Sequence, residues 1–521
     1  MKDLLGQRIQ ALLDSEAAST LAGMQRGIEK ESLRISGEGK LARTPHPSSL
    51  GSALTHPWIT TDYSEALLEF ITPPSDTLSA PLDFLDRIHR YTYSQIDDEL
   101  LWVNSMPCVM GEDNDIPLAE YGSSNVGMMK HIYRRGLGLR YGRRMQTIAG
   151  IHYNFSFPQA FWQLHQQQED DQRPLQDFIS DRYFDLLRNF QRYSWLLIYL
   201  FGASPAVCAS FLRGREHQLE ERSGHTLYQP MATSLRMSDL GYQNNAQSQL
   251  HISYNNLDDY VRTLTDAIKT VDPVYQKLGV KIDGEYQQLN ANILQIENEY
   301  YSSIRPKRTI NSGERPTLAL ARRGVEYIEI RALDLNPFEP LGINLEQIRF
   351  LDIFASYCLL HESPALSETD LADSKRNIRK VVYQGRSPEL TLCNWGKGVP
   401  LRQWAREKFA QMEPIAELFD RISGGDSYQQ ALNAQKDKIE HPENTPSARI
   451  LAELDRNNSS FFTFAMEKAQ QHREHFLSHP LDDDTRRDFV EHARQSMEQQ
   501  QQVEAQDNQS FEEYLAAYFR D

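Results

Sequence analysis

Cysteine is scarce in this sequence of 521 residues, which contains four in all. They lie far apart, at Cys108, Cys208, Cys358 and Cys393, and no Cys-x-x-Cys pair occurs. A zinc ribbon is therefore excluded, and a disulfide framework of the kind that stabilises small secreted domains is not expected. We expect Cys208, Cys358 and Cys393 to be buried, inert thiols.

The sequence also lacks an excess of positive charge and a P-loop. Lys and Arg total 55 against 72 Asp and Glu, a formal net charge of −17, which argues against a nucleic-acid-binding or membrane-surface protein. No GxxxxGK[ST] motif occurs, so a nucleotide would have to be held in another way. The Gly-rich basic segment YRRGLGLRYGRR, residues 133–144, is a candidate anion-binding loop. The alternative is a turn beside a solvated basic helix end.

Long hydrophobic runs are missing as well. The uncharged segment WLLIYLFGASPAVCASFL, residues 195–212, just reaches the length of about 18 residues that a membrane span needs. Gly202, Ser204 and Pro205 interrupt it, which predicts a buried helix, a turn and a second buried element. At the N-terminus, charged residues separate the leucines of MKDLLGQRIQALLDSEAAS, which is typical of an amphipathic helix and not of a signal peptide. We expect a cytoplasmic protein with no membrane partner.

What the sequence does contain changes in character along the chain. From about residue 23 to 338, short alternating strands recur between helical segments, whereas helical patterns dominate after about residue 345. We therefore expect the chemistry in a catalytic antiparallel-sheet core, residues 1–345. A mainly helical part, residues 346–521, is expected to pack on it as one integrated unit.

Several predicted strands carry acidic residues on one face. In GMQRGIEKESLRI, a strand places Gly27, Glu29 and Glu31 on one side and Ile28 and Lys30 on the other. A solvated edge strand of mixed charge is the alternative interpretation.

The stretch ALLEFITP places Glu69 among core-building residues. In a strand Glu69 shares a face with Leu67 and Ile71, so alternation does not bring its carboxylate to solvent. An unpaired buried charge is costly, so a cation is expected to meet it. A salt bridge to an arginine and a bound metal both satisfy that requirement. Asp62 and Glu65 lie just upstream.

Further strands add a histidine and an arginine to this pattern. AGIHYNFSFP alternates with His152, Asn154 and Ser156 on one face, and GVEYIEIRAL places Glu329 with Arg331. A lone histidine of this kind is often only a satisfied polar residue. The segment NANILQIENEYYSSIRPKR predicts another strand with Gln295, Glu297, Glu299 and Tyr301 on one side, and it ends in a basic cluster, residues 305–308.

Taken together, these strands predict a sheet with one apolar face and one face rich in carboxylates. Like charges repel and raise each other's pKa, so such a surface requires cations. Oxygen ligands with one imidazole suit Mg²⁺ or Mn²⁺. Metal ions and arginine on an antiparallel sheet form a suitable platform for a nucleoside triphosphate.

The motifs as a set resemble the glutamate–cysteine ligases (γ-glutamylcysteine synthetases) of the proteobacterial type. The resemblance extends from about residue 20 to 460 and rests on eight segments in the same order. They are RGIEKESLR, LGSALTHPWITTDYSEALLEFITP, YGSSN, LRYGRRMQTIAGIHYNFSF, YLFGASPA, SLRMSDLGY, LQIENEYYSSIRPKR and GVEYIEIRALDLNPF.

The resemblance implies an α+β fold of glutamine-synthetase type, in which a funnel-like antiparallel sheet is surrounded by helices. It implies an ATP-dependent ligase that joins the γ-carboxylate of L-glutamate to the amine of L-cysteine through γ-glutamyl phosphate, the first step of glutathione synthesis. Mg²⁺, or Mn²⁺ in its place, is the implied metal, and we expect a monomer. The alternatives are a related ligase with another amine substrate, a metal-dependent hydrolase and a non-catalytic amino-acid binding protein.

The resemblance also implies roles for individual residues. Arg331 matches the arginine that faces the transferring phosphoryl group. The positions that match metal ligands are Glu29, Glu31, Asp62, Glu69, His152 and Glu329. The positions that match the amino-acid sites are Tyr63, Tyr133, Leu137, Gln146, Arg236, Tyr242 and Tyr301.

Overall fold

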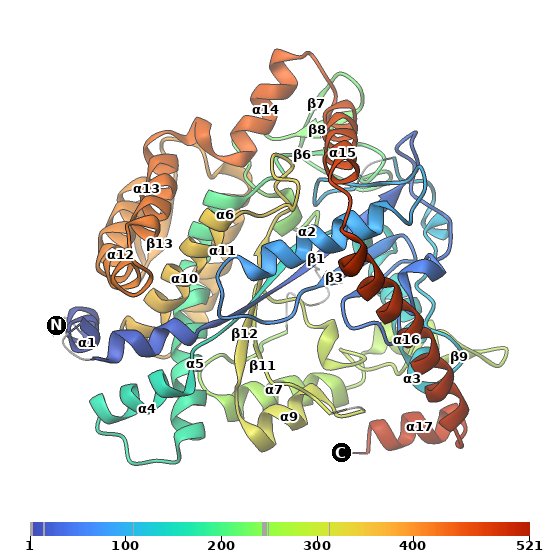
Figure 1. Ribbon diagram of the computed structural model, residues 1–521, viewed down its shortest axis with the longest axis horizontal. Helices are drawn as coiled ribbons and strands as arrows, with labels where there is room; N and C mark the ends of the chain where they lie inside the picture. The colour runs from blue at the N-terminus through green and yellow to red at the C-terminus, as the bar shows by residue number, and fades with distance from the viewer. Residues whose placement is uncertain are drawn as a thin grey trace.

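The structure is a computed structural model that describes residues 4–13, 16–107, 109–241, 247, 250–311 and 313–520 (Figure 1). These residues form a central sheet of seven strands in which every pairing is antiparallel. Its order is β11-β12-β5-β1-β3-β2, and β4 pairs with one end of β1. The strands are β1 (Gln25–Ile35), β2 (Ile59–Thr61), β3 (Leu67–Ile71), β4 (Leu100–Leu101), β5 (Ile151–Ser156), β11 (Ile304–Lys307) and β12 (Tyr327–Leu333).

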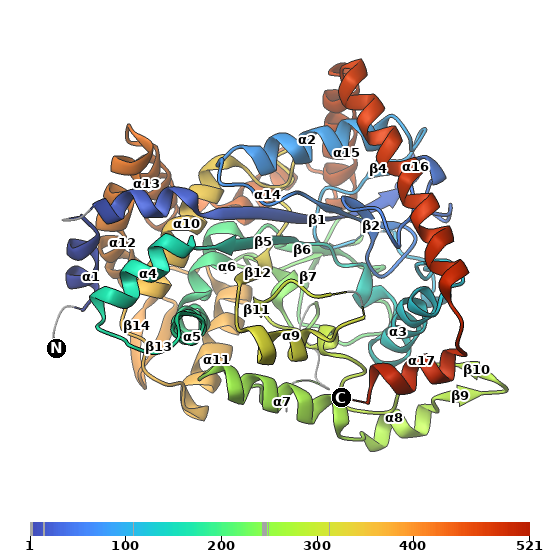
Figure 2. The ribbon, with the colours of Figure 1, turned by 60° about the horizontal axis from the view of Figure 1, so that its bottom comes forward.

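The alternation predicted for the acidic strands is confirmed. β1 lies between β5 and β3, so it is a central strand and not a solvated edge. Lys30 points away from Glu29 and Glu31 and lies 2.6 Å from His89 of α2 (Ala80–Tyr93), between Lys30 Nζ and His89 Nε2. Helix α2 therefore covers the face opposite the acids, and Figure 2 shows it running along β1.

The remaining elements surround this sheet. Helices before residue 345 are α1 (Leu4–Leu13), α3 (Asn125–Tyr141), α4 (Gln159–Gln168), α5 (Leu175–Tyr193), α6 (Trp195–Phe201), α7 (Leu257–Lys269), α8 (Pro273–Leu278) and α9 (Pro316–Arg323). Short strands form small separate sheets: β6 (Ala206–Cys208), β7 (Glu220–Arg222) and β8 (Thr226–Tyr228); β9 (Lys281–Ile282) and β10 (Glu285–Tyr286); β13 (Thr391–Asn394) and β14 (Lys397–Pro400).

The later part of the chain is mainly helical, as the sequence predicts. Its helices are α10 (Leu345–Leu360), α11 (Glu368–Gln384), α12 (Leu401–Ser423), α13 (Ser427–Glu440), α14 (Pro446–Arg456), α15 (Phe461–Ser478), α16 (Asp483–Gln506) and α17 (Phe511–Tyr518). One hydrophobic cluster extends from Leu5 to Phe489 and takes in side chains of the sheet and of these helices. The fold is α+β, which confirms the predicted class. The division at residue 345 stays a prediction.

Two local predictions are wrong. The segment YRRGLGLRYGRR is not an anion-binding loop, because residues up to Tyr141 belong to α3 and Gly142 ends that helix with a φ of 86°. The residues around Glu297 are not a strand either, because Glu297–Glu299 form a 3-10 turn, η7. Both segments carry polar side chains that pack on the protein interior. Their order of polar and apolar residues therefore resembles that of a loop in the first segment and that of a strand in the second.

The uncharged segment 195–212 folds as predicted, into buried helix α6, a turn and strand β6. Over the described residues, no helix is both long enough and apolar enough to cross a membrane. The expectation for the thiols holds for Cys358, which is free and fully buried, but is wrong for Cys208, which is engaged in a disulfide. Cys393 is free and half-buried, and its Sγ donates to Asp373 at 2.9 Å.

Candidate active site

The register of the central sheet brings the predicted acids together. Glu29 of β1 lies opposite His152 of β5, and Glu31 lies opposite Glu69 of β3. Glu329 of β12 lies opposite Asn154 of β5. Because cross-strand partners point to the same face, five strands from β12 to β2 present one continuous polar surface. Asp62 follows the last residue of β2 directly.

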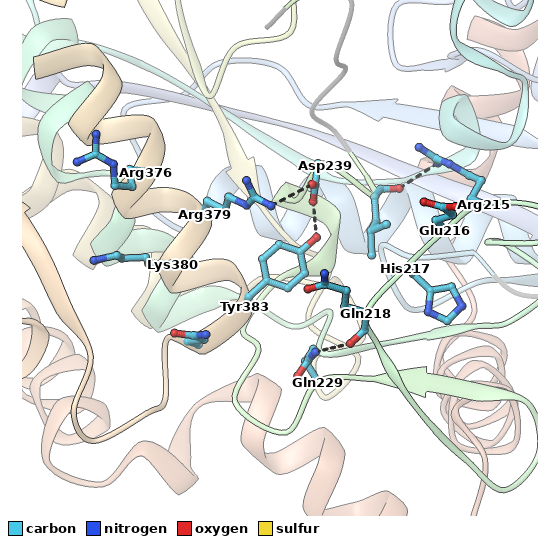
Figure 3. A pocket seen from close by; sticks show the side chains of 12 residues that line it. Arg215, Glu216, His217, Gln218, Gln229, Asp239, Arg376, Arg379, Lys380 and Tyr383 are labelled. Carbon is cyan, nitrogen blue, oxygen red and sulfur yellow. Dashed lines mark hydrogen bonds and ion pairs between the residues drawn. The ribbon is translucent and has the colours of Figure 1, made fainter. Parts of the chain in front are cut away.

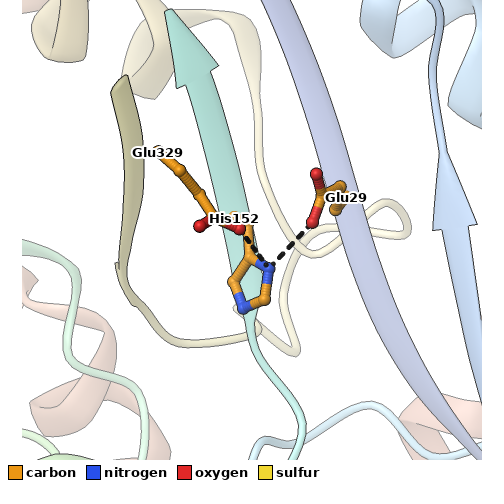
Figure 4. A group of neighbouring side chains, drawn as sticks. All are labelled: Glu29, His152 and Glu329. Carbon is orange, nitrogen blue, oxygen red and sulfur yellow. Dashed lines mark hydrogen bonds and ion pairs between the residues drawn. The ribbon is translucent and has the colours of Figure 1, made fainter. Parts of the chain in front are cut away.

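The first group on this surface is the histidine cluster, Glu29, His152 and Glu329 (Figure 4). His152 Nδ1 lies 3.1 Å from Glu29 Oε2 and 3.4 Å from Glu329 Oε1. Asn154 Nδ2 donates to Glu29 Oε1 at 2.9 Å. One ligand atom from each member of the cluster lies within 4.8 Å of the others. This spacing allows all three to reach one metal ion.

The second group is the carboxylate cluster, Glu31, Asp62 and Glu69. Glu31 Oε2 accepts a hydrogen bond from Gly150 N at 2.6 Å, which fixes that carboxylate beside β5. Burial, together with the charge of Asp62, raises the pKa of Glu69 well above its usual range. Burial also raises the pKa of Glu31. The protein thus holds these carboxylates where its own cations do not fully compensate their charge.

The surroundings of Glu329 shift its pKa in the opposite direction. Burial acts to raise its pKa, yet Lys307 and Arg331 hold that pKa well below its usual range. Lys307 Nζ lies 3.4 Å from Glu329 Oε2, and Arg331 Nη1 donates to Oε1 at 3.1 Å. The same sheet therefore carries a carboxylate with a lowered pKa at one end and carboxylates with raised pKa values toward the other.

The residues present fit a hard divalent cation. No described residue supplies a hydrogen-bond partner to two buried atoms that face this surface, His152 Nε2 and Asn154 Oδ1, and Glu329 Oε2 has only the ion pair with Lys307. Buried polar atoms without partners are rare and costly, so they point to a ligand. Carboxylate oxygens with one imidazole nitrogen suit Mg²⁺ or Mn²⁺ better than a thiolate-binding metal.

Beyond the carboxylate cluster, the residues predicted for the amino-acid sites form a wall. Gln146 Nε2 donates to the hydroxyl of Tyr301 at 2.8 Å. Burial raises the pKa of Tyr133 well above its usual range, and Glu299 and Tyr301 act in the same direction. These three side chains come from the 3-10 turn after α3, from the segment after η7 and from α3 itself.

Other predicted residues line the edges of that wall. Tyr63 is buried, and its hydroxyl lies 2.4 Å from the position that a Cβ on Gly138 of α3 would take. Leu137, on the same helix, is buried as well. Arg236 is buried and its Nη2 donates to the carbonyl of Arg331 at 3.0 Å. Tyr242 lies outside the described residues, so its placement stays a prediction.

Two residues at this site were not assigned from the sequence. Lys307 was seen only as part of a basic cluster, although its alternation with Arg305 on β11 already placed it on one face. Arg134 of α3 lies in the segment YRRGLGLRYGRR, for which the sequence predicts a loop. Its Nε donates to the carbonyl of Asp62, so it joins α3 to the end of β2.

A separate cavity of about 970 Å³ lies between α11 and the turn after Arg236 (Figure 3). Two of its arginines are held by carboxylates of the protein: Arg379 lies 3.7 Å from Asp239, and Arg376 donates to Asp373 at 2.9 Å. The residues described around it include none of those predicted for the site. The sheet surface is therefore the candidate active site.

Comparisons with known proteins agree with this assignment. The family model described as glutamate–cysteine ligase matches residues 9–381. A glutamate–cysteine ligase from Alcanivorax borkumensis is 68% identical, with 99% of each chain covered, and one from Azotobacter vinelandii is 52% identical, with 99% of this chain and 98% of the relative covered. The crystal structure of the Francisella tularensis glutamate–cysteine ligase in complex with AMP superposes with a TM-score of 0.90 at 38% identity, covering 96% of this chain and 98% of that one.

Proposed function

The chain belongs to the glutamate–cysteine ligase family, and we propose which of its residues carry each part of the reaction of that family. The activity is the ATP-dependent joining of glutamate to cysteine, which gives γ-glutamylcysteine in the first step of glutathione synthesis. We propose that it proceeds through γ-glutamyl phosphate and that the enzyme is a cytoplasmic monomer.

We assign divalent-metal binding to the histidine cluster and to the carboxylate cluster. Bound Mg²⁺ or Mn²⁺ supplies positive charge that neutralises phosphate and carboxylate oxygens. The observation that carries the proposal is the surface itself: six ligand-type side chains lie together on it, and His152 Nε2 among them is buried without a hydrogen-bond partner in the described part of the chain. Asn154 orients Glu29 by donating to its Oε1, which leaves Oε2 toward His152.

We assign the phosphoryl group to the Glu329 end of the surface. Arg331 and Lys307 approach Glu329 from β12 and β11, and their guanidinium and ammonium groups are placed to stabilise charge that develops on transferring oxygens. A cationic group that is already fixed in place costs no reorganisation during the reaction, which is the source of its catalytic effect.

We assign the amino acids to the wall formed by Tyr133, Gln146, Tyr301 and Arg236. Arg236 is the buried cation nearest to Gly150, where its Nη2 lies 2.1 Å from the position that a Cβ would take. A guanidinium in this place can pair with a substrate carboxylate. The aromatic rings of the wall exclude water, which would otherwise hydrolyse an acyl phosphate.

A product assay tests the activity. ADP and γ-glutamylcysteine are measured with ATP and Mg²⁺, while glutamate and cysteine are added singly and together. We expect γ-glutamylcysteine only with both amino acids, and ADP release that depends on glutamate. Equal ADP release without glutamate, or no γ-glutamylcysteine with both, would overturn the proposal.

A metal titration tests the ligand assignment. Glu329→Gln removes the charge but keeps the shape, so the Mg²⁺ concentration for half-maximal activity should rise at least tenfold, as is roughly typical of lost metal-site ligands and partners. Glu389→Gln, at an exposed position, is the matched control and should behave as the wild type. An unchanged Mg²⁺ dependence in Glu329→Gln would remove that residue from the metal site.

A further inference from the structure

The last two helices run along the outside of the molecule, far in sequence from the sheet. We call α16 and α17 the C-terminal arm. Figure 1 shows the arm in red, passing down one side of the molecule to α3, and Figure 2 shows α17 beside α3 from another angle. Three of its contacts fall on segments that lead to or carry the outer wall of the proposed amino-acid site.

The first contact is with the chain that leads into β2 and Asp62. Ser52 N donates to Ser496 Oγ at 2.9 Å, and Thr55 Oγ1 donates to Ser496 O at 2.5 Å. Gly51 has a φ of 84°, and a Cβ there would lie 2.8 Å from Ala493 Cα. Helix α16 thus approaches this backbone too closely for any other residue at position 51.

The second contact is with the start of α3. Ser123 N donates to Glu504 Oε1 at 2.9 Å, and Asn125 N donates to Asp507 Oδ2. The side-chain amide of Asn125 also donates to Gln509 O at 3.1 Å. These acceptors satisfy amide groups at the end of a helix where carboxylates are favourable.

The third contact is a small hydrophobic core of its own. It consists of Met129 and Ile132 of α3, Leu289 and Ile296 of the segment before η7, and Phe511 and Leu515 of α17. Tyr133 packs against this cluster. Gln295, next to Ile296, donates from Nε2 to the carbonyl of Tyr133 at 3.2 Å.

We propose that the C-terminal arm is a positioning element for the amino-acid site. The arm supports the outer wall at two places: at the segment that leads to Asp62 and at helix α3, which carries Tyr133 and Leu137. Arg134 joins these two places by donating to the carbonyl of Asp62. The inference rests on the proposed function of that wall, and it assigns to the arm no contact with substrate.

The test separates amino-acid binding from nucleotide binding. Leu515→Ala removes apolar contact with the back of α3, and Met497→Ala, an exposed position on α16, is the matched control. For Leu515→Ala we expect the KM for cysteine to rise about tenfold, with the KM for ATP and kcat within about twofold of the wild type. Such a change corresponds to about 1.4 kcal/mol of binding free energy. A rise of similar size in the KM for cysteine and the KM for ATP with an equal fall in kcat, or no change in the KM for cysteine, would overturn the proposal.

A second variant keeps the proposal testable if Leu515→Ala fails to fold. Asp507→Asn keeps the shape but weakens the hydrogen bond to Asn125. Hydrogen exchange of the amides of α3 should become faster in this variant, whereas exchange in β1 and β5 should stay as in the wild type. Unchanged exchange in α3 would contradict the role of the arm. Failure of the proposed function would show instead in the wild type, as the absence of γ-glutamylcysteine.

Discussion

Glu69 and Glu329 lie on the same face of one sheet, yet their carboxyl groups differ in opposite directions from ordinary glutamate. Burial and the charges of Asp62 and Glu29 raise the pKa of Glu69, whereas Lys307 and Arg331 hold the pKa of Glu329 low. The difference arises from which cations each residue can reach. A carboxylate whose charge the protein leaves uncompensated is the one that gains most from an added metal ion.

Glu69→Gln should therefore stabilise the protein in the absence of Mg²⁺ and lower its activity. Without Mg²⁺, the amide removes repulsion from the carboxylate cluster, and stabilisation by about 1 kcal/mol is the usual size of such gains at functional sites. With Mg²⁺, the variant should gain less thermal stability than the wild type and lose most of its activity. Thermal denaturation in EDTA and in Mg²⁺ measures both effects, with Glu389→Gln as control. Full activity together with a wild-type Mg²⁺ response would show that Glu69 is not a ligand.

Arg331→Lys tests geometry at constant charge. Lysine lacks the planar fork of the guanidinium, so the contact that Arg331 Nη1 makes with Glu329 cannot be reproduced while a second N–H points at a phosphoryl oxygen. We expect kcat to fall by roughly 10²–10³, the cost of one preorganised donor. Arg322→Lys, at an exposed position on α9, should leave kcat unchanged. A kcat near that of the wild type in Arg331→Lys would place the arginine outside the phosphoryl site.

At the scale of elements, strands were predictable and helix α3 was not. His152 and Glu329 stand in strands whose apolar residues alternate cleanly, and alternation fixes the face of a side chain. Helix α3 has glycines and arginines scattered over its surface because it is wedged between the site and α17, so it shows no clear apolar stripe. Its close approach to Gln295 at Gly136 depends on segments far apart in sequence, which no local pattern reveals.

The segment before β2 contains a histidine that should make stability depend on pH. His56 Nδ1 accepts hydrogen bonds from Trp58 N at 3.1 Å and Ile59 N at 3.0 Å, so the ring is neutral there. Burial, with a contribution from His492, lowers the pKa of His56 from 6.5 to about 4. The unfolded chain binds this proton more readily, so the stabilisation is present above about pH 6.5 and is lost as pH falls toward about 4.

His56→Asn should remove much of that dependence, because the amide oxygen can accept the same hydrogen bonds without titrating. Between about pH 7 and pH 5 the wild type should lose about 2 kcal/mol more free energy of unfolding than the variant. Urea unfolding at the two pH values measures this difference. His441→Asn, at an exposed position, is the control. Parallel losses in the wild type and in His56→Asn would contradict the assignment.

At the scale of the whole molecule, a buried ion pair joins the sheet to the later helices. Arg26 of β1 lies 2.8 Å from Asp352 of α10, between Nη2 and Oδ2, and both side chains are almost fully buried. The hydroxyls of Tyr153 and Tyr428 donate to the same carboxylate at 2.7 and 3.1 Å. Side chains from β1, β5 and α13 thus meet at the carboxylate of Asp352 on α10.

Asp352→Ala should destabilise the protein by about 3–5 kcal/mol, because Arg26 would stay buried without its partner. We expect a lower urea midpoint but still one transition, since the sheet and the later helices share a core. The double variant Arg26→Met, Asp352→Leu should recover part of the loss, as apolar replacements of buried pairs often do. Two separate transitions would show that residues 1–345 and 346–521 unfold independently.

The position of the C-terminal arm has a consequence for how the enzyme is made. The strands of the sheet leave the ribosome first, and domains begin to fold during synthesis. The histidine cluster, whose members all precede residue 345, can therefore assemble while residues 483–518 are still to be translated. The outer wall of the amino-acid pocket and the segment that leads to Asp62 gain their support only with the last helices. A nascent enzyme would thus form its histidine cluster before its amino-acid site.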